Sequence, residues 1–429
     1  MNTTIKSNNK DTKASETFNA ACHQTKDLGP ESGKEATPPT DTSNSPAPPT
    51  SFTLITKLDF SDFFQESARL GKGGYGEVVL VKPVAGKHHV KNPTLFSRPN
   101  NSLMQWSPNE CHDNVYTNAY GVMALNTMQM KPRDIFWNIR DVDFSLSVPY
   151  HPNLIHIYEM FISFKDSHLQ INIVMECVLQ SLKSYLPDSE SKTHLSPKDL
   201  KSVLRQLLQA IDHIHKSGFV HRDIKADNIL LTPISDYFSA EFGSTSPDLI
   251  SMEDKYALKL ADYGVSKRTT EAPPADPYLV GTRPYMAPEI LLLDSDHGAP
   301  VDIWSFCCVV YELITGSKLF ANCWGSKDMV KHMVKKLGTP YDMRQKQAPL
   351  GHVPAFGYWH KAKRLMRTSG IKIRKQIYVV SLKPMFKDCY LCGHEDFEPL
   401  LDVLRASLRW NPAERATAEH LLNMPYFTS

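Results

Sequence analysis

The chain has 429 residues, enough for one large domain or two ordinary ones, each with its own core. Its 48 lysines and arginines nearly balance 46 acidic residues, and a net charge of +2 gives no reason to expect a nucleic acid or a membrane as partner. No apolar run approaches the ~20 residues that span a bilayer. The polar N-terminus lacks the apolar core of a secretion signal, so we expect a cytoplasmic or nuclear protein.

Residues 1–58 are rich in Ser, Thr, Asn and Pro and poor in large apolar side chains. Such a segment buries too little surface to offset the entropy lost on ordering, which predicts a disordered tail.

The segment from Arg69 to Val81 alternates and is interrupted by glycines, a pattern that predicts a β-hairpin. Glycines in a tight turn let backbone N–H groups approach phosphate oxygens without a Cβ in the way. Alone the pattern is weak, and a hairpin without a ligand would explain it equally well. The candidate phosphate-binding residues are Leu70, Gly71, Lys72, Gly73, Gly74, Tyr75, Gly76 and Val78.

Beyond this hairpin, strand patterns precede helical ones. The predicted strands cover 120–128 and 171–175, and the predicted helices cover 135–148, 200–215, 301–315, 328–337 and 397–408. Strands first and helices afterwards indicate an α+β body with two lobes, a small β-rich one and a larger helical one.

The run from His221 to Asn228 places a carboxylate, a lysine and an amide on one short loop before an apolar strand. Asp223 could accept a proton from a hydroxyl group, Lys225 could neutralise a migrating phosphoryl group, and Asn228 could hold a divalent metal. Phosphoryl transfer needs this set, because the protein supplies positioning and charge while nucleotide and metal supply the rest.

These residues resemble the catalytic loop of eukaryotic protein kinases, and Lys225 resembles the serine/threonine branch. The glycine pattern, together with Asp262-Tyr-Gly264, matches two further kinase motifs. The resemblance implies a bilobal kinase domain over residues 59–428, with Asp223 and Lys225 as catalytic residues and Asn228 and Asp262 as Mg²⁺ ligands. It implies ATP and Mg²⁺ as cofactors and a protein as substrate, with Met175 lining the adenine pocket.

Other motifs resemble the scaffold of a kinase. The resemblance implies that Thr282 stands beside Asp223, that Glu289 pairs with Arg415, and that Asp302 braces the catalytic loop. Residues 337–340 and 423–427 look like the group of cyclin-dependent and mitogen-activated kinases, from which Met286 departs.

Three insertions are expected, near 92–119, 232–254 and 344–391. The last holds a basic run at 361–367, interpreted as a solvated face, with docking of an acidic or phosphorylated partner as the alternative. It also ends near Cys389-x-x-Cys392 with His394, which could ligate zinc. Since no second cysteine pair stands at a suitable distance, structural thiols are the better interpretation.

The strand lysine that grips the nucleotide phosphates in a kinase has no clear counterpart. The strand at 120–128 carries Asn126 in that place. In an alternative alignment Lys91 is the lysine, although Pro93 would cut its strand short. Lys82 is a further substitute, and true absence of the lysine stays open.

The helix residue that pairs with this lysine is Asp141 rather than Glu. Asp is shorter by about 1.5 Å, and a misplacement of ~1 Å can cost on the order of 10²-fold in rate. Slow turnover follows from this interpretation. The alternative is that Asp141 is simply a solvated charge on the helix.

Two functional hypotheses follow, a serine/threonine kinase of reduced activity and a nucleotide-binding pseudokinase that acts as a scaffold or allosteric activator. A third, in which the basic run contacts RNA, is disfavoured by the neutral overall charge.

Arg222 beside Asp223 suggests that a phosphate on the following segment activates the protein, through an activating kinase or regulatory partner. Thr269, Thr270 and Tyr278 are the candidate acceptors.

Overall fold

The structure is a computed structural model. It describes residues 64–72, 77–83, 123–129, 135–165, 168–186, 195–234, 254–272, 279–293, 297–321, 323, 325–338, 382, 385–386 and 389–429. All of these belong to one compact unit, Phe52–Ser429, and the other unit, Met1–Ser51, lies outside them.

A five-stranded antiparallel sheet opens the described part of the chain, with the strand order β1-β2-β3-β5-β4. Its strands are β1 Phe64–Lys72, β2 Glu77–Pro83, β3 Met123–Gln129, β4 Ile157–Lys165 and β5 His168–Glu176. The predicted hairpin and both predicted strands are thereby confirmed. Because β3 pairs with β2 on one side and β5 on the other, Asn126 lies opposite Val78 and Ile173.

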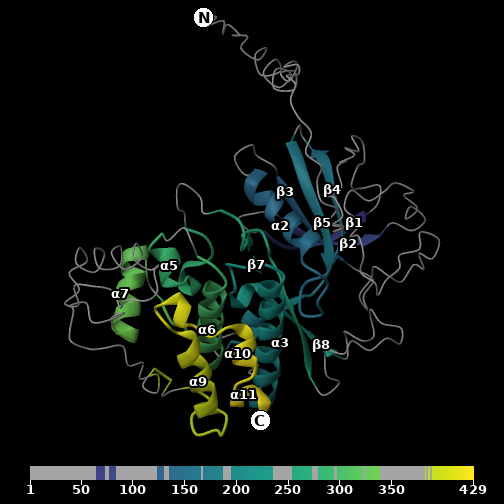
Figure 1. Ribbon diagram of the computed structural model, residues 1–429. Helices are drawn as coiled ribbons and strands as arrows, with labels where there is room; N and C mark the ends of the chain where they lie inside the picture. The colour runs from purple at the N-terminus through teal and green to yellow at the C-terminus, as the bar shows by residue number, and fades with distance from the viewer. Residues whose placement is uncertain are drawn as a thin grey trace, which may run out of the picture. The chain divides into compact units, whose positions relative to one another are not determined.

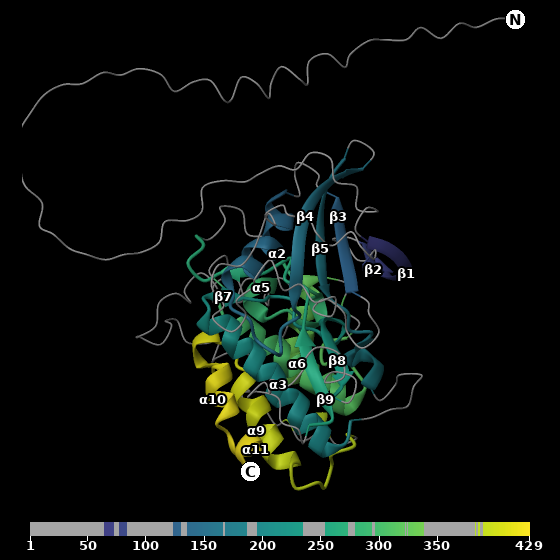
Figure 2. The ribbon, with the colours of Figure 1, turned by 90° about the vertical axis from the view of Figure 1, so that its right-hand side faces the viewer.

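Helix α2, Ile135–Ser147, packs on this sheet (Figures 1 and 2). Its Val142 contacts the buried Ile171 and Ile173 of β5. Phe144, two residues further along and so on the opposite side of the helix, faces the larger core instead. The helix therefore links the sheet to the elements that follow.

Helices dominate the chain after β5 (Figure 1). They are α3 Pro197–Lys216, α5 Pro288–Leu291, α6 Pro300–Thr315, α7 Ser326–Leu337, α9 Phe397–Ser407, α10 Ala418–Leu422 and α11 Pro425–Thr428. Of the five predicted helices, the last four correspond to α3, α6, α7 and α9, with ends that differ by at most three residues. Strands followed by helices confirm the α+β class.

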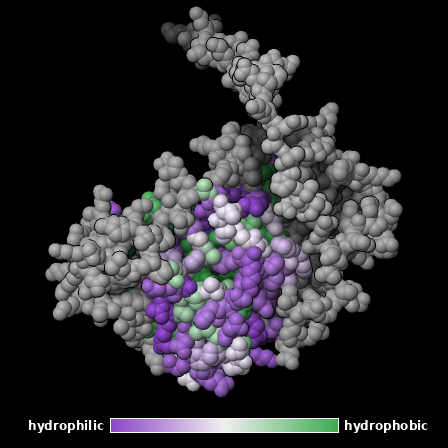
Figure 3. All heavy atoms as spheres, in the orientation of Figure 1, coloured by the Kyte–Doolittle hydropathy of each residue, from purple (hydrophilic) through white to green (hydrophobic). Residues whose placement is uncertain are grey.

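The core of this helical part surrounds α6, which is apolar on every side and buried from Val301 to Ile314. A helix of this kind must be packed against other elements on every side. On the face in Figure 3, hydrophilic residues dominate the described surface, as expected for helices with one apolar face. No helix among the described residues is long and apolar enough to cross a bilayer.

Short strands place the candidate catalytic residues. A three-stranded sheet has the order β6-β8-β9, made of Gln180–Ser181, Ile229–Pro233 and Tyr256–Leu260, and β7 Phe219–Val220 pairs with β10 Lys267–Arg268. The loop 221–228 therefore runs between β7 and β8. Asp262 follows β9, the neighbour of β8, so the chain brings the two predicted motifs together.

Candidate active site

Asp302, at the start of α6, holds the loop that carries Asp223. Its two carboxylate oxygens accept 2.8 Å hydrogen bonds from the backbone N–H groups of His221 and Arg222, and His215 Nε2 lies 2.9 Å away. Burial alone would raise the pKa of Asp302, but the hydrogen bond and charge of His215, with the other donors, keep it below its ordinary value. The predicted bracing role of Asp302 is confirmed. Arg222 adopts a φ of 70°, a strained conformation that this anchorage holds in place.

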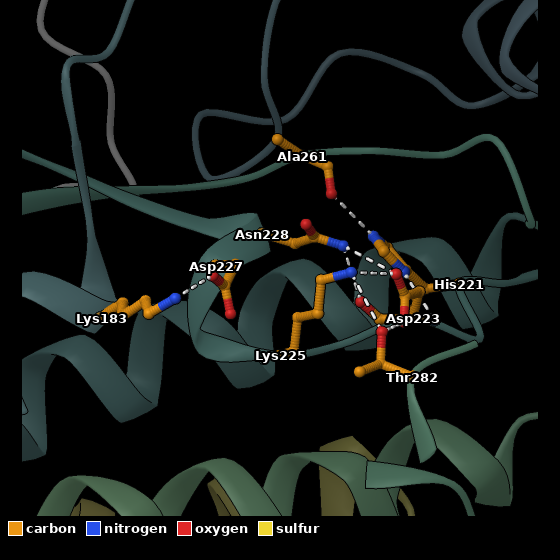
Figure 4. Close-up of polar contacts among 8 residues, drawn as sticks. All are labelled: Lys183, His221, Asp223, Lys225, Asp227, Asn228, Ala261 and Thr282. Atoms are coloured by element: carbon orange, nitrogen blue, oxygen red, sulfur yellow. Dashed lines mark hydrogen bonds and ion pairs between the residues drawn. The ribbon is translucent and has the colours of Figure 1, made fainter. Parts of the chain in front are cut away.

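Asp223 lies at the centre of a polar cluster (Figure 4). Lys225 Nζ donates to its Oδ2 at 2.6 Å, and Thr282 Oγ1 donates to its Oδ1 at 2.7 Å. Lys225 Nζ also lies 3.1 Å from Thr282 Oγ1, and Asn228 Nδ2 donates to the Asp223 backbone oxygen at 2.9 Å. As predicted, Thr282 stands beside Asp223, and the predicted catalytic pair shares one hydrogen-bond network.

Gly281 is the point at which the segment after Asp262 returns to the catalytic loop. Its φ is +91°, and a Cβ there would lie 2.3 Å from the Arg222 backbone oxygen. No side chain fits in that space, so glycine is required. This close approach brings Thr282 within reach of Asp223.

Asp262 lies near the Asp223 cluster, as the sequence predicts. Burial of the carboxyl group, followed by the negative charge of Asp223, raises the pKa of Asp262. The charges of His221 and Lys225 and the hydrogen bond from the Gly264 backbone N–H oppose this shift. Part of its surface is still open to solvent. Two neighbouring carboxylates form a site where a divalent cation would be stabilised.

Tyr263 takes the place of the phenylalanine usual in this kinase motif. Its ring stacks on Phe144 of α2 with centroids 3.9 Å apart. Its hydroxyl group donates to the Leu260 backbone oxygen at 2.8 Å and accepts from the Ile155 backbone N–H at 3.1 Å. Tyrosine therefore keeps the expected aromatic packing and adds two polar contacts.

Asp141 is buried, which contradicts the alternative that it is a solvated helix charge. Its carboxyl group accepts a hydrogen bond from the Tyr263 backbone N–H. Burial, followed by the charge of Asp262, raises the pKa of Asp141 to about 8. Among the described residues no cation pairs with Asp141. Within the described part of the chain, this helix acid thus contacts the Asp262 motif.

The predicted nucleotide-binding residues are only partly within the described chain. Val78, Ala124, Met175 and Cys177 pack in one apolar cluster, and Leu70 is exposed. The backbones of Gly71 and Lys72 belong to β1. Gly73, Gly74, Tyr75, Gly76 and Lys91 lie outside the described residues, as do Tyr278 and the basic run 361–367. The assignment of Lys91 as the anchoring lysine stays a prediction.

A buried ion pair joins the last residue of β5 to β9, the strand before Asp262. Lys259 Nζ lies 2.9 Å from Glu176 Oε2, with side chains only 1% and 5% exposed. Glu176 Oε2 also accepts from the His156 backbone N–H at 3.1 Å. Sequence reasoning missed this pair. An isolated lysine within the apolar strand β9 is the signal that points to it, because a buried lysine needs an anion.

The Cys389 and Cys392 sulfurs lie 3.6 Å apart, and Cys392 Sγ contacts the Phe386 backbone oxygen. Among the described residues no group of three or more metal-ligating side chains is found. The interpretation of this pair as structural thiols stays a prediction. The C-terminal scaffold prediction is confirmed, because Arg415 Nη2 donates to Glu289 Oε2 at 2.7 Å.

The fold and this site define a protein kinase. The family model described as "protein kinase domain" matches residues 113–427, so the chain belongs to the protein kinase family. It is a eukaryotic serine/threonine kinase near the group of cyclin-dependent and mitogen-activated kinases. The match begins after β2, so the glycine-containing hairpin lies before it.

Curated relatives agree with this assignment. The meiosis induction protein kinase IME2/SME1 of Saccharomyces cerevisiae is 34% identical over 407 residues, covering 92% of this chain and 58% of that protein. The sporulation protein kinase mde3 of Schizosaccharomyces pombe is 27% identical, covering 85% and 55%. Human cyclin-dependent kinase-like 4 is 28% identical, covering 65% and 60%. The chain spans at most about 60% of the length of these relatives.

Proposed function

We propose that this protein transfers the γ-phosphoryl group of ATP to serine or threonine hydroxyl groups of a protein substrate. The observation that carries the proposal is the shared network of Asp223, Lys225 and Thr282. In this proposal the sheet with α2 and the helical part are the two lobes of the kinase fold. An active enzyme is favoured because every described catalytic-loop contact is in place.

The described residues fit a magnesium nucleotide. Asp262 and Asn228 present a carboxylate and an amide oxygen, the ligand types that Mg²⁺ prefers. The apolar cluster of Val78, Ala124 and Met175 suits a flat aromatic base. Bound nucleotide and metal would supply the transferable phosphoryl group and the positive charge beside it.

The protein's own residues would prepare the acceptor hydroxyl group. Asp223 would orient it and accept its proton, a role that typically contributes ~10²–10⁴-fold. Lys225 would stabilise negative charge near the transferred group, because its ammonium group already lies beside Asp223. Thr282 would keep the Asp223 carboxylate in one orientation through the 2.7 Å hydrogen bond.

A pseudokinase is the second candidate, and Asn126 favours it. A neutral amide stands on β3 where a kinase has its lysine, and its Oδ1 is buried with no hydrogen-bond partner among the described residues. Without a cation there, the nucleotide phosphates would lose an anchor. Such a protein would bind nucleotide or a partner and act as a scaffold or allosteric activator.

Radiolabel transfer from ATP to a generic basic protein, and to the chain itself, distinguishes the two candidates. An active kinase labels its substrate, and Asp223→Asn abolishes the label. If Lys91→Met also abolishes it, Lys91 is the anchoring lysine. No transfer by the parent protein with Mg²⁺ or Mn²⁺ would refute the kinase proposal and support the scaffold.

A cytoplasmic or nuclear location is part of the proposal, since both compartments supply ATP and reduced thiols. The names of two relatives refer to meiosis and sporulation, and a role in such a developmental programme is proposed for this chain on that likeness.

A further inference from the structure

The position of α2 matters for the site because two of its side chains contact the Asp262 motif. Phe144 stacks on Tyr263. Asp141 accepts from the Tyr263 backbone N–H, and its Oδ2 lies 3.0 Å from where a Cβ on Gly264 would stand. A shift of α2 would therefore displace Asp262, and errors of ~1 Å in a catalytic group can cost on the order of 10²-fold in rate.

Strand β3 offers no charged side chain at Asn126 to hold α2. Within the described part of the chain Asp141 forms no ion pair, and a carboxamide on β3 cannot provide one. Two ion pairs described for α2 are instead made with Arg268 and Glu271, shortly after the Asp262 motif.

The first of these contacts joins Arg140 of α2 to Glu271. The pairing is bidentate, with Nη2–Oε1 at 2.7 Å and Nη1–Oε2 at 3.2 Å. Arg140 Nη1 also donates to the Ser266 backbone oxygen, and the Arg140 side chain is only 8% exposed. A bidentate pair with one largely buried partner is stronger than an ordinary surface ion pair.

In the second contact, α2 carries the negative charge and the segment carries the positive one. Arg268 Nε donates to Asp143 Oδ2 at 2.8 Å, and its Nη2 contacts Asp143 Oδ1 and Ser147 Oγ. Arg268 also lies over the Phe219 ring, 4.8 Å from its centroid. Since Arg268 belongs to β10, which pairs with β7 just before the catalytic loop, this contact ties α2 to the loop that carries Asp223.

We propose that these two ion pairs, here called the helix clamp (Arg140–Glu271 and Asp143–Arg268), fix α2 and thereby Asp262 without a phosphate on this segment. Each pair joins a charge on α2 to the opposite charge on the segment, so sliding α2 along its axis breaks both. Glu271 and Arg268 are positioning residues, because they act through Asp141, Phe144 and Tyr263. The carboxylate of Glu271 gives Arg140 a negative charge that needs no phosphorylation.

The structure also changes the interpretation of Arg222. Its Nε donates to the Val265 backbone oxygen at 2.7 Å, and Nη1 lies 3.3 Å from His297 Nε2. Arg222 thus contacts the segment directly through backbone oxygens. Thr269 and Thr270 are exposed, and Thr269 Oγ1 contacts the Gly218 backbone oxygen.

The first test compares the full-length parent, Glu271→Gln and Glu271→Asp. Glu271→Gln should speed amide hydrogen exchange in α2 by about 10-fold and lower kcat by ~10–100-fold, with a smaller change in KM for the protein substrate. Glu271→Asp keeps the negative charge, so it should restore part of the protection from exchange and part of kcat. Glu419→Gln is the matched control, because Glu419 makes an exposed ion pair with Lys216, away from α2.

The second test exchanges the charges of the more exposed pair, whose side chains are 44% and 38% exposed and tolerate substitution. Asp143→Arg and Arg268→Asp should each speed exchange in α2, and the double variant should restore the parent value. The clamp would be overturned if Glu271→Gln and Glu419→Gln had the same hydrogen exchange in α2 and the same kcat. It would also be overturned if the double variant did not recover the exchange rate of the parent. Activity that appears only after phosphorylation of Thr269 or Thr270 would overturn it as well.

The clamp rests on the proposed function only for its kinetic readout. If the parent transfers no phosphate but Glu271→Gln still speeds exchange in α2, the clamp stands and the kinase proposal fails. If the parent is active and neither exchange nor kcat responds to Glu271→Gln, the kinase proposal stands and the clamp fails.

Discussion

The Tyr263 hydroxyl group shows how one atom can anchor the Asp262 motif. It bridges the Leu260 backbone oxygen and the Ile155 backbone N–H, which belong to segments more than 100 residues apart in the chain. Another tyrosine, Tyr426, is also buried, but its hydroxyl group has no hydrogen-bond partner among the described residues. The same substitution should therefore have different effects at the two positions.

We expect Tyr263→Phe to lower the free energy of unfolding by about 1 kcal/mol, the net value of a typical buried hydrogen bond. Tyr426→Phe should be neutral or slightly stabilising, because it removes a buried polar group without a described partner. Urea unfolding of the two variants and the parent measures both differences. Equal losses at both positions would contradict the anchoring role of the Tyr263 hydroxyl group.

His151 gives the fold a defined sensitivity to acid. Its Nδ1 accepts from the Asn153 backbone N–H, and burial, followed by the charges of His213 and Lys259, lowers the pKa of His151 to about 3. Between pH 3 and the ordinary value of 6.5, the folded protein therefore binds fewer protons here than the unfolded chain. Stability conferred by neutral His151 is present above pH 6.5 and is lost as the pH falls.

From this group alone the free energy of unfolding should fall by up to about 1.4 kcal/mol per pH unit below 6.5, or roughly 2 kcal/mol at pH 5. His151→Gln should flatten the dependence over this range, which urea unfolding at pH 5, 6 and 7 would measure. His394→Gln, which changes an exposed histidine, is the control. A variant as acid-sensitive as the parent would show that other groups cause the loss.

Among the elements, the segment after Asp262 depends on Gly281. Gly281→Ala places a Cβ 2.3 Å from the Arg222 backbone oxygen at a φ of +91°. Gly338 ends α7 with a similar φ of +80°, yet a Cβ there would meet no atom within 4 Å. Both glycines have a positive φ, so a comparison of the two variants shows what the close contact at Gly281 adds.

Gly338→Ala should cost about 1–3 kcal/mol of stability, because its positive φ with an extended ψ is a conformation that only glycine adopts readily. Gly281→Ala should cost more and should lower phosphotransfer by about 10²-fold, because Thr282 can no longer reach Asp223. Thermal unfolding and the radiolabel assay measure the two effects. Similar behaviour of both variants would show that the approach of Gly281 to Arg222 is unimportant.

These elements also show what the sequence could and could not predict. The loop 221–228, Asp262, Thr282 and the Glu289–Arg415 pair were predicted because each belongs to a short motif with few conformations. Apolar periodicity located α2, α3 and α9, because their buried faces repeat along the helix. The helix clamp was not predicted, since Arg140 and Glu271 stand 131 positions apart and belong to no motif that requires the pair.

The environment of Asp141 marks a second limit. Composition and spacing indicate a charged residue on an amphipathic helix, which is equally consistent with solvent exposure. Only the packing of α2 against Tyr263 shows that the carboxyl group is buried beside Asp262. Burial of a single charge depends on tertiary contacts, and local pattern carries little information about it.

For the whole molecule, one buried ion pair joins the C-terminal segment to the helical core. Arg415 pairs with Glu289 of α5, with side chains 0% and 2% exposed. It also donates to the backbone oxygens of Arg409, Trp410 and Pro300, and its guanidinium group lies 5.1 Å from the Trp304 ring centroid. One side chain thus connects α5, the first residue of α6 and the segment after α9.

Arg415→Met should lower the free energy of unfolding by about 3–5 kcal/mol, because it leaves the Glu289 carboxylate buried without its partner. Arg405→Met removes an arginine from the exposed pair with Asp402 and should cost less than about 1 kcal/mol. Because Arg415 contacts several elements, tryptophan fluorescence and far-UV circular dichroism should report one shared, lowered transition in denaturant. Separate transitions would mean that the C-terminal segment unfolds independently of the helical core, and that the ion pair does not make the two unfold together.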